Sequence, residues 1–139
     1  LYDRYRDDSF SPFGAAKPEV FGPEIIHELV ENDRLTPEGE MGAIDADPIC
    51  SCQDPTDMKA TVGEVSIQGA DRAVAKVKLQ WPLPPDPIPS QIPDYTQNVT
   101  LQLQMTPAGW RVRDIGGDEA RDSFLAYLRE ENRNRRAGR

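Results

Sequence analysis

The stretch "RAVAKVKLQW", residues 72–81, decides the fold because its apolar and polar side chains alternate. Alternation with a period of two places successive side chains on opposite faces of a β-strand. One face would carry Ala73, Ala75, Val77, Leu79 and Trp81, and the other Lys76, Lys78 and Gln80. The stretch therefore predicts a strand in an antiparallel sheet that has one covered face and one solvated face.

Three further segments repeat this alternation, at residues 60–68, 97–105 and 110–115. Gly63 interrupts the first of them and predicts a β-bulge. In the last, "WRVRDI", the shared parity of Trp110, Val112 and Asp114 predicts that all three face the core. Turn residues separate the segments, so about four strands are expected to follow one another in a meander.

Helical periodicity flanks the predicted strands. Residues 23–35 begin with Pro23, which suits the first position of a helix, and place Ile25, Ile26, Leu29 and Val30 in one apolar stripe. A second helix is expected over residues 118–133, and a short helical end opens the connector at residues 1–22. The fold class predicted is α+β, with a curved antiparallel sheet packed by two N-terminal helices and one C-terminal helix in a single domain, residues 1–139.

The net charge of the chain limits the classes of partner that it could bind. The 139-residue chain carries a net charge of −8, which argues against nucleic-acid binding, because phosphate contacts need a basic surface. The C-terminal tail at residues 129–139 is an exception, with five arginines and two glutamates giving +3. We expect this tail to be a solvated, frayed helix end, and contact with an anionic surface is the alternative.

A proline-rich hairpin loop at residues 82–95, "PLPPDPIPSQIPDY", joins two of the strands and holds six prolines. Proline at this density favours extended polyproline II geometry and keeps the loop out of the sheet. The loop is interpreted as a stiff surface segment. The alternative is an arm that contacts a partner or covers a pocket.

Both cysteines lie in "DADPICSCQD", residues 45–54. A zinc site needs about four ligands, whereas this segment offers one cysteine pair, nearby aspartates and no histidine, so no metal is predicted. Redox motifs of the C-x-x-C kind have a different spacing. Two alternatives remain, a Cys50–Cys52 disulfide and two free thiols. We favour the disulfide, which requires a bend at Ser51.

The strands at 72–81 and 97–105, the "GWRVRDI" turn and strand, and the helix headed by Ser123 together resemble the nuclear transport factor two-like fold. The similarity is to an exported bacterial branch of unknown function that is often anchored as a lipoprotein. It covers roughly residues 23–128. The resemblance implies a curved sheet wrapped by helices into a cone with a pocket at its open end.

The candidate residues for lining that pocket are Tyr2, Tyr5, Trp81, Trp110 and Asp114. Isomerases of this fold place acids in the pocket together with a tyrosine donor, so Asp114 is the candidate catalytic residue if the chain is an enzyme. The favoured alternative is that Asp114 pairs with an arginine or caps the C-terminal helix.

The function expected is therefore that of a non-enzymatic binding or interaction protein of the cell envelope, periplasmic or secreted, without a cofactor. Its partner would be a protein or a small-molecule ligand, and not a nucleic acid. The chain starts at Leu1 without a leader, and a removed signal peptide or lipoprotein anchor is expected, which could hold it near the membrane. There are two alternatives. The chain could be a small isomerase or lyase, or it could be a homodimeric assembly module that pairs through the outward sheet face around Val74.

Overall fold

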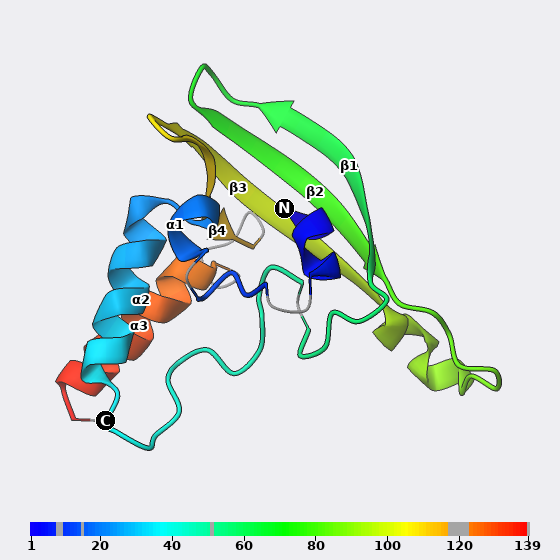
Figure 1. Ribbon diagram of the computed structural model, residues 1–139, viewed down its shortest axis with the longest axis horizontal. Helices are drawn as coiled ribbons and strands as arrows, with labels where there is room; N and C mark the ends of the chain where they lie inside the picture. The colour runs from blue at the N-terminus through cyan, green and yellow to red at the C-terminus, as the bar shows by residue number, and fades with distance from the viewer. Residues whose placement is uncertain (8–9, 15, 51, 117–122, 139) are drawn as a thin grey trace.

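The computed structural model describes residues 1–7, 10–14, 16–50, 52–116 and 123–138 (Figure 1). The elements, in chain order, are η1 (Tyr2–Arg6), α1 (Lys17–Val20), α2 (Pro23–Leu35), β1 (Lys59–Ile67), β2 (Arg72–Gln80), η2 (Pro89–Tyr95), β3 (Thr96–Thr106), β4 (Gly109–Ile115) and α3 (Phe124–Arg136). The predicted α+β class is confirmed, with a sheet of four strands that is not closed.

The sheet is an antiparallel meander in the order β1-β2-β3-β4. Two irregularities interrupt its register. Between Val62 and Val65 the pairing with β2 shifts, which is the bulge that Gly63 predicted. A second shift in β4 leaves Arg113 without a directly opposite residue, because Val112 pairs with Leu103 and Asp114 already pairs with Gln102.

Helices cover one face of the sheet unevenly. Figure 1 shows α2 and α3 side by side at the β4 end, with β1 at the opposite edge. Ile25 and Leu29 of α2 and Leu128 of α3 are buried among Val77, Leu79 and Leu101. Val30, predicted in the same apolar stripe, is exposed on α2. The N-terminal segment adds Phe21, which is buried and forms an isolated parallel bridge with Val112 of β4.

The prediction that Trp110 packs in the core is wrong, because this side chain is 40% exposed. Trp110 pairs with Met105, which is 43% exposed, at the tip of the β3–β4 hairpin. The predicted strand parity is correct for Trp110, which shares a face with Met105 and buried Leu101. The tip, however, extends beyond the helices that cover that face (Figure 1). The predicted parity is wrong for Asp114, because the bulge at Arg113 pairs Asp114 with Gln102 on the other face.

Two segments differ from their predictions. The loop at residues 82–95 is not extended throughout, because its second half forms the 3₁₀ helix η2, which contains Pro93. Residues 129–136 are not a frayed tail, because they are the last turns of α3 and pack on α2. The helix that was predicted from residue 118 begins at Phe124, and residues 117–122 lie outside the described part of the chain.

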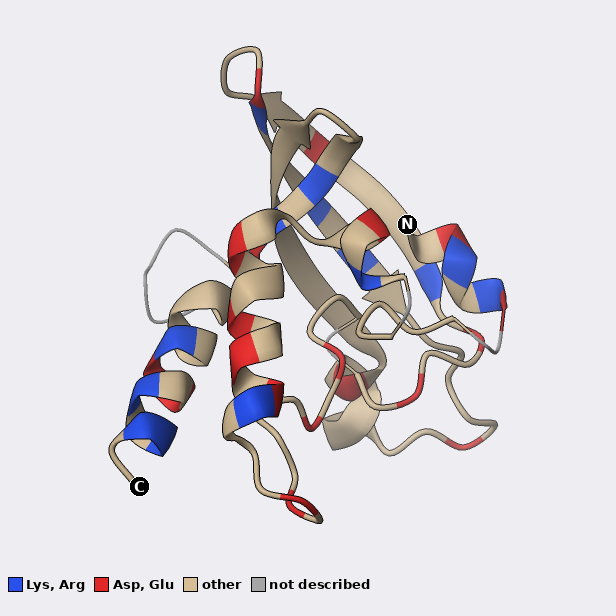
Figure 2. Ribbon diagram, turned by 60° about the vertical axis from the view of Figure 1, so that its left-hand side comes forward, with Lys and Arg blue, Asp and Glu red and all other residues tan. Residues whose placement is uncertain are grey.

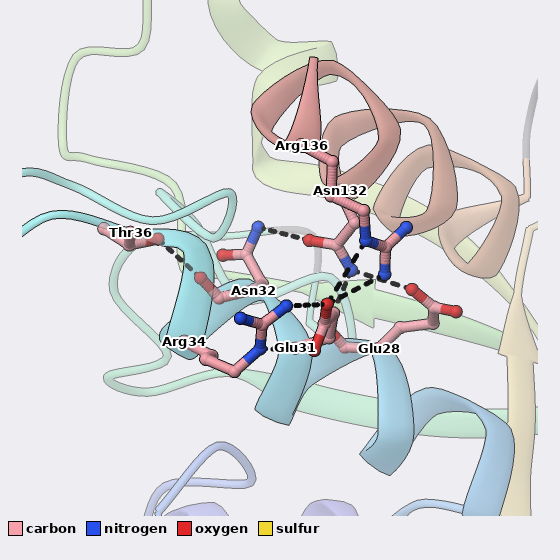
Figure 3. Close-up of polar contacts among 7 residues, drawn as sticks. All are labelled: Glu28, Glu31, Asn32, Arg34, Thr36, Asn132 and Arg136. Carbon is pink, nitrogen blue, oxygen red and sulfur yellow. Dashed lines mark hydrogen bonds and ion pairs between the residues drawn. The ribbon is translucent and has the colours of Figure 1, made fainter. Parts of the chain in front are cut away.

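Buried asparagines hold α2 and α3 together (Figure 3). Asn32 donates from Nδ2 to Oδ1 of Asn132 at 2.9 Å, and both residues are buried. Asn132 in turn donates to the backbone oxygen of Glu28 at 3.0 Å and to its carboxylate at 2.7 Å. Asn32 Oδ1 accepts from the backbone N–H of Ala43 at 2.9 Å, which ties the following loop to the helix pair.

Charged side chains surround this pair at the surface. Figure 2 shows acidic residues along α2 and basic residues along α3. Arg136 donates to Glu31 at 3.0 Å, and Arg34 of α2 donates to the same carboxylate. These hydrogen bonds, those from Arg34 first, lower the pKa of Glu31 to about 2. Two basic residues of the predicted tail, Arg129 and Arg136, therefore face carboxylates of α2.

None of the helices in the described ranges has the length and apolar character needed to cross a membrane.

Replacing Asn132 by alanine should lower the free energy of unfolding by about 2–3 kcal/mol, because Asn32 would lose its acceptor inside the core. Urea unfolding followed by circular dichroism measures this. Asn134→Ala makes the same chemical change two residues along α3, where the side chain is not buried, and should cost nothing since alanine is the better helix former. Equal losses in the two variants would contradict a special role for the buried pair.

Candidate functional site

A cleft of about 520 Å³ lies where the chain leaves β2 and enters the proline-rich loop. Two aromatic residues, Trp81 and Tyr95, line it together with three carboxylates, Asp54, Asp57 and Asp94. Among the described residues that line the cleft, none is lysine, arginine or histidine. The cleft therefore combines aromatic surface with uncompensated negative charge.

Trp81 is fixed in this cleft by two hydrogen bonds. Its backbone N–H donates to the carbonyl oxygen of Tyr95 at 2.9 Å, which closes the base of the 82–95 loop. Its indole Nε1–H donates to the backbone oxygen of Asp54 at 3.1 Å. The polar group of the ring is thus satisfied by the protein, and the half-buried ring remains part of the cleft wall.

The carboxylates come from a turn before β1 and from the loop before β3. Asp54 accepts from the backbone N–H of Thr56 at 2.9 Å, and hydrogen bonds from the Thr56 hydroxyl and backbone lower the pKa of Asp54. Asp57 has φ of 59°, in the left-handed region that few side chains adopt. Asp94 belongs to η2. Aspartate adopts this region more readily than most residues, and the turn is closed by the hydrogen bond from the Met58 N–H to the Pro55 oxygen.

Negative charge in a concave site raises the local concentration of cations, because the low-dielectric walls focus the field. Aromatic faces attract cations through the quadrupole of the ring. Both effects favour a positively charged group over an anion in this cleft. Grouped acidic, histidine or cysteine side chains that could hold a metal ion are not found in the described part of the chain.

The cysteine segment forms one wall of the cleft. Cys50 and Cys52 are joined by a disulfide with a Cα–Cα distance of 5.2 Å, and Cys52 lines the cleft. Asp47 and Cys52 exchange backbone hydrogen bonds at 2.9 and 3.1 Å, and Asp47 Oδ1 also accepts from the Ile49 N–H at 2.8 Å. Because Ile49 and Cys50 are fully buried, the segment connects the core to the cleft.

Two predicted pocket residues, Tyr2 and Tyr5, bind this segment outside the cleft. Tyr5 donates from its hydroxyl to the carboxylate of Asp47, and Tyr2 donates to the backbone oxygen of Ile49 at 2.8 Å. Burial is the first cause that raises the pKa values of both tyrosines and of Asp47. The tyrosines therefore remain protonated donors at neutral pH and clamp η1 onto the loop.

Asp114, the candidate catalytic acid, contacts the beginning of α3. One carboxylate oxygen accepts from the backbone N–H groups of Ile115 and Leu125 at 2.8 and 2.9 Å. The other accepts from the hydroxyl of Ser123 at 2.5 Å, and Ser123 itself caps the helix by accepting from the Ala126 N–H. A carboxylate here also interacts favourably with the positive end of the helix dipole.

Of the five predicted site residues, the structure places Trp81 in the cleft and the other four elsewhere, with Trp110 at the β3–β4 tip. Sequence reasoning missed Asp94 and Tyr95, which sit at the end of the proline-rich loop. Their signal was available in the strand register, because Gln80 pairs with Thr96 and so brings Tyr95 beside Trp81. Asp54 and Asp57 were not predicted as site residues either.

Replacing Asp114 by asparagine should lower the free energy of unfolding by about 1–3 kcal/mol, because the change removes charged hydrogen bonds to three partners. Thermal and urea unfolding measure the effect. Asp71→Asn, an exposed site at the β1–β2 turn, serves as the control and should change little. An Asp114→Asn variant as stable as the natural protein would contradict the capping role and favour a residue kept for catalysis.

The chain is similar to a curated protein, but the comparisons do not assign it to a family. The chain is 32% identical over 136 residues to the uncharacterized protein YqhG of Escherichia coli (strain K12). The alignment covers 95% of this chain but only 40% of the relative, so the chain spans less than half of that protein's length. No family model matches the chain, and no solved structure matches it either.

Proposed function

We propose that this chain is a non-enzymatic binding domain of the cell envelope and that its cleft beside Trp81 holds a cationic group of the ligand. The observation that carries the proposal is the lining of the cleft, in which Trp81 and Tyr95 stand with three carboxylates and no basic side chain among the described residues. Choline-like, amine or guanidinium groups have the matching chemistry.

A binding role is favoured over catalysis because the acids suited to proton transfer are occupied by structural contacts. Asp114 accepts hydrogen bonds from Ser123 and Leu125 at the start of α3. Asp47 accepts from Tyr5, and this contact joins η1 to the disulfide segment. A general base must be able to reach the proton it removes, so these contacts support the assignment of both acids to the scaffold.

The proposed fold family is the nuclear transport factor two-like fold. A four-stranded antiparallel meander with helices on one face supports this resemblance. The cleft lies at one end of the sheet, between the disulfide segment and the proline-rich loop. The proposed counterpart of the cone pocket is therefore this cleft rather than the region around Asp114.

Choline should bind the cleft weakly, with a Kd on the order of 1 mM, and should change the fluorescence of Trp81. A Trp110→Phe background leaves Trp81 as the sole tryptophan, since the chain has 2. The uncharged isostere 3,3-dimethyl-1-butanol has nearly the same shape and should bind at least tenfold more weakly. Calorimetry provides a second measurement that does not depend on the fluorophore.

Asp94→Asn should weaken choline binding about threefold to tenfold, since it removes one carboxylate from the wall. Asp86→Asn lies in the same loop, is exposed and does not line the cleft, so it should have no effect. Equal affinity for choline and its neutral isostere would contradict the cationic ligand. No binding of either compound would contradict the cleft as a small-ligand site.

A periplasmic or secreted location is proposed from the Cys50–Cys52 disulfide, because disulfides persist in oxidising compartments. The full-length protein should fractionate with the periplasm or envelope. Thiol titration of that fraction after denaturation without reductant should find no free thiol in residues 1–139. Recovery in the cytoplasm with two free thiols would contradict the location.

A further inference from the structure

The two edges of the sheet differ in whether another segment pairs with them. At the β4 edge, Phe21 forms a parallel bridge with Val112, and the backbone N–H of Gly22 donates to the Val112 oxygen at 2.9 Å. At the β1 edge, no further strand or bridge is present among the described residues. An open strand edge offers a row of backbone donors and acceptors to another strand.

β1 also carries apolar side chains that no helix covers. Val62, Val65 and Ile67 are 58%, 50% and 67% exposed. Their partners on β2 are Val77, Ala75 and Ala73, all of which are buried, and directly opposite residues share a face of the sheet. The three exposed residues therefore continue the core-facing side of the sheet past the end of its helical cover.

The order of these residues is symmetric about the bulge. Counted from the midpoint between Gly63 and Glu64, Val62 mirrors Val65 and Ala60 mirrors Ile67. Two copies of β1 could pair antiparallel about a two-fold axis at this midpoint. Val62 of each copy would then lie opposite Val65 of the other on one face of the sheet, and Thr61 would lie opposite Ser66 on the other face. Both copies carry the same bulge, and Gly63 of one copy lies opposite Glu64 of the other, so the register holds on both sides of the axis.

The charges along β1 are compatible with this register. The chain carries −8, yet β1 and β2 together carry four basic residues and one acidic residue. The symmetric register puts Lys59 opposite Gln68 and Glu64 opposite Gly63. In this register no like charges lie directly opposite along the paired strands.

We propose that this chain forms a two-fold symmetric homodimer in which β1 pairs with β1 of a second copy, extending the sheet across both molecules. The contact would involve one strand from each copy, so we expect it to be smaller than a standard interface of about 800 Å² per partner. The dimer should accordingly be reversible, with a Kd on the order of micromolar. The cleft lies next to the Lys59 end of β1, whereas Val62 and Val65 lie in the middle of the strand.

A cysteine pair tests the register directly. In Val62→Cys/Val65→Cys, each new cysteine faces its counterpart in the second copy, and mild oxidation should link most of the protein into covalent dimers. The single variant Val62→Cys is the control, because its two copies would stand three residues apart along the strands, beyond the reach of a disulfide. Non-reducing electrophoresis measures the products.

Charged substitutions on the two faces of the sheet test which face takes part in the dimer. Val65→Asp should weaken dimerisation at least tenfold in sedimentation equilibrium, with folding confirmed by circular dichroism. Val74→Asp makes the same change on the outward face of β2 and should leave the dimer intact, since Val74 does not take part in the edge.

The choline titration separates this inference from the proposed function, because Val65→Asp should leave the cleft affinity unchanged. A protein that stays monomeric at several hundred micromolar would overturn the homodimer. Any partner of the β1 edge would then be a strand other than β1 of a second copy. A dimer that is broken by Val74→Asp but not by Val65→Asp would overturn it in favour of pairing through the outward face. Equal cross-linking of the single and double cysteine variants would overturn the register.

Discussion

The hydrogen bond between Asn32 and Asn132 constrains the position of everything on the helical side of the molecule. An amide pair inside an apolar core is costly unless each group finds its partner, so it accepts only one registration of α2 against α3. The same pair sets the loop that follows α2, because Asn32 Oδ1 also accepts from Ala43. Gly42 fits beside it because a Cβ there would lie 3.0 Å from that oxygen.

Once α2 and α3 are fixed to each other, Asp114 fixes them to the sheet. Its carboxylate joins the end of β4 to the N-terminus of α3 through Ser123 and Leu125. The helices consequently sit at the β4 side, and the cover runs out before β1. The exposed apolar side chains of β1 are a result of this placement, since their own sequence would suit a buried strand face.

The disulfide segment contributes residues both to the core and to the cleft. Ile49 and Cys50 fill the core, while Cys52 reaches the cleft beside Trp81. Tyr2 and Tyr5 hold the segment from the N-terminal side through Ile49 and Asp47. The acids of the chain thus divide into those that accept hydrogen bonds within the scaffold and those that line an open, negatively charged cleft. The second group is what makes a cationic ligand the natural proposal.

The sequence by itself determined the class of the fold, because strand and helix periodicity are local properties that survive without knowledge of the neighbours. It placed the four strands, the bulge at Gly63 and the helix beginning at Pro23, and a disulfide between cysteines two residues apart could be argued from chain geometry. Alternation also identified the inward face of Trp110 and Val112, but the bulge at Arg113 reverses the alternation, so Ile115 and not Asp114 lies opposite buried Leu101.

Only the tertiary structure decided how far that inward face is covered and which polar residues remain available. Trp110 has the parity of a core residue but lies at a hairpin tip beyond the helices, and no local pattern encodes helix placement. Asp114 and Tyr5 looked like site residues because their side chains suit catalysis, yet each found a structural partner elsewhere in the fold, at Ser123 and at Asp47. Exposure and hydrogen-bond partnership depend on contacts between segments distant in the chain, and those are fixed only when the segments pack.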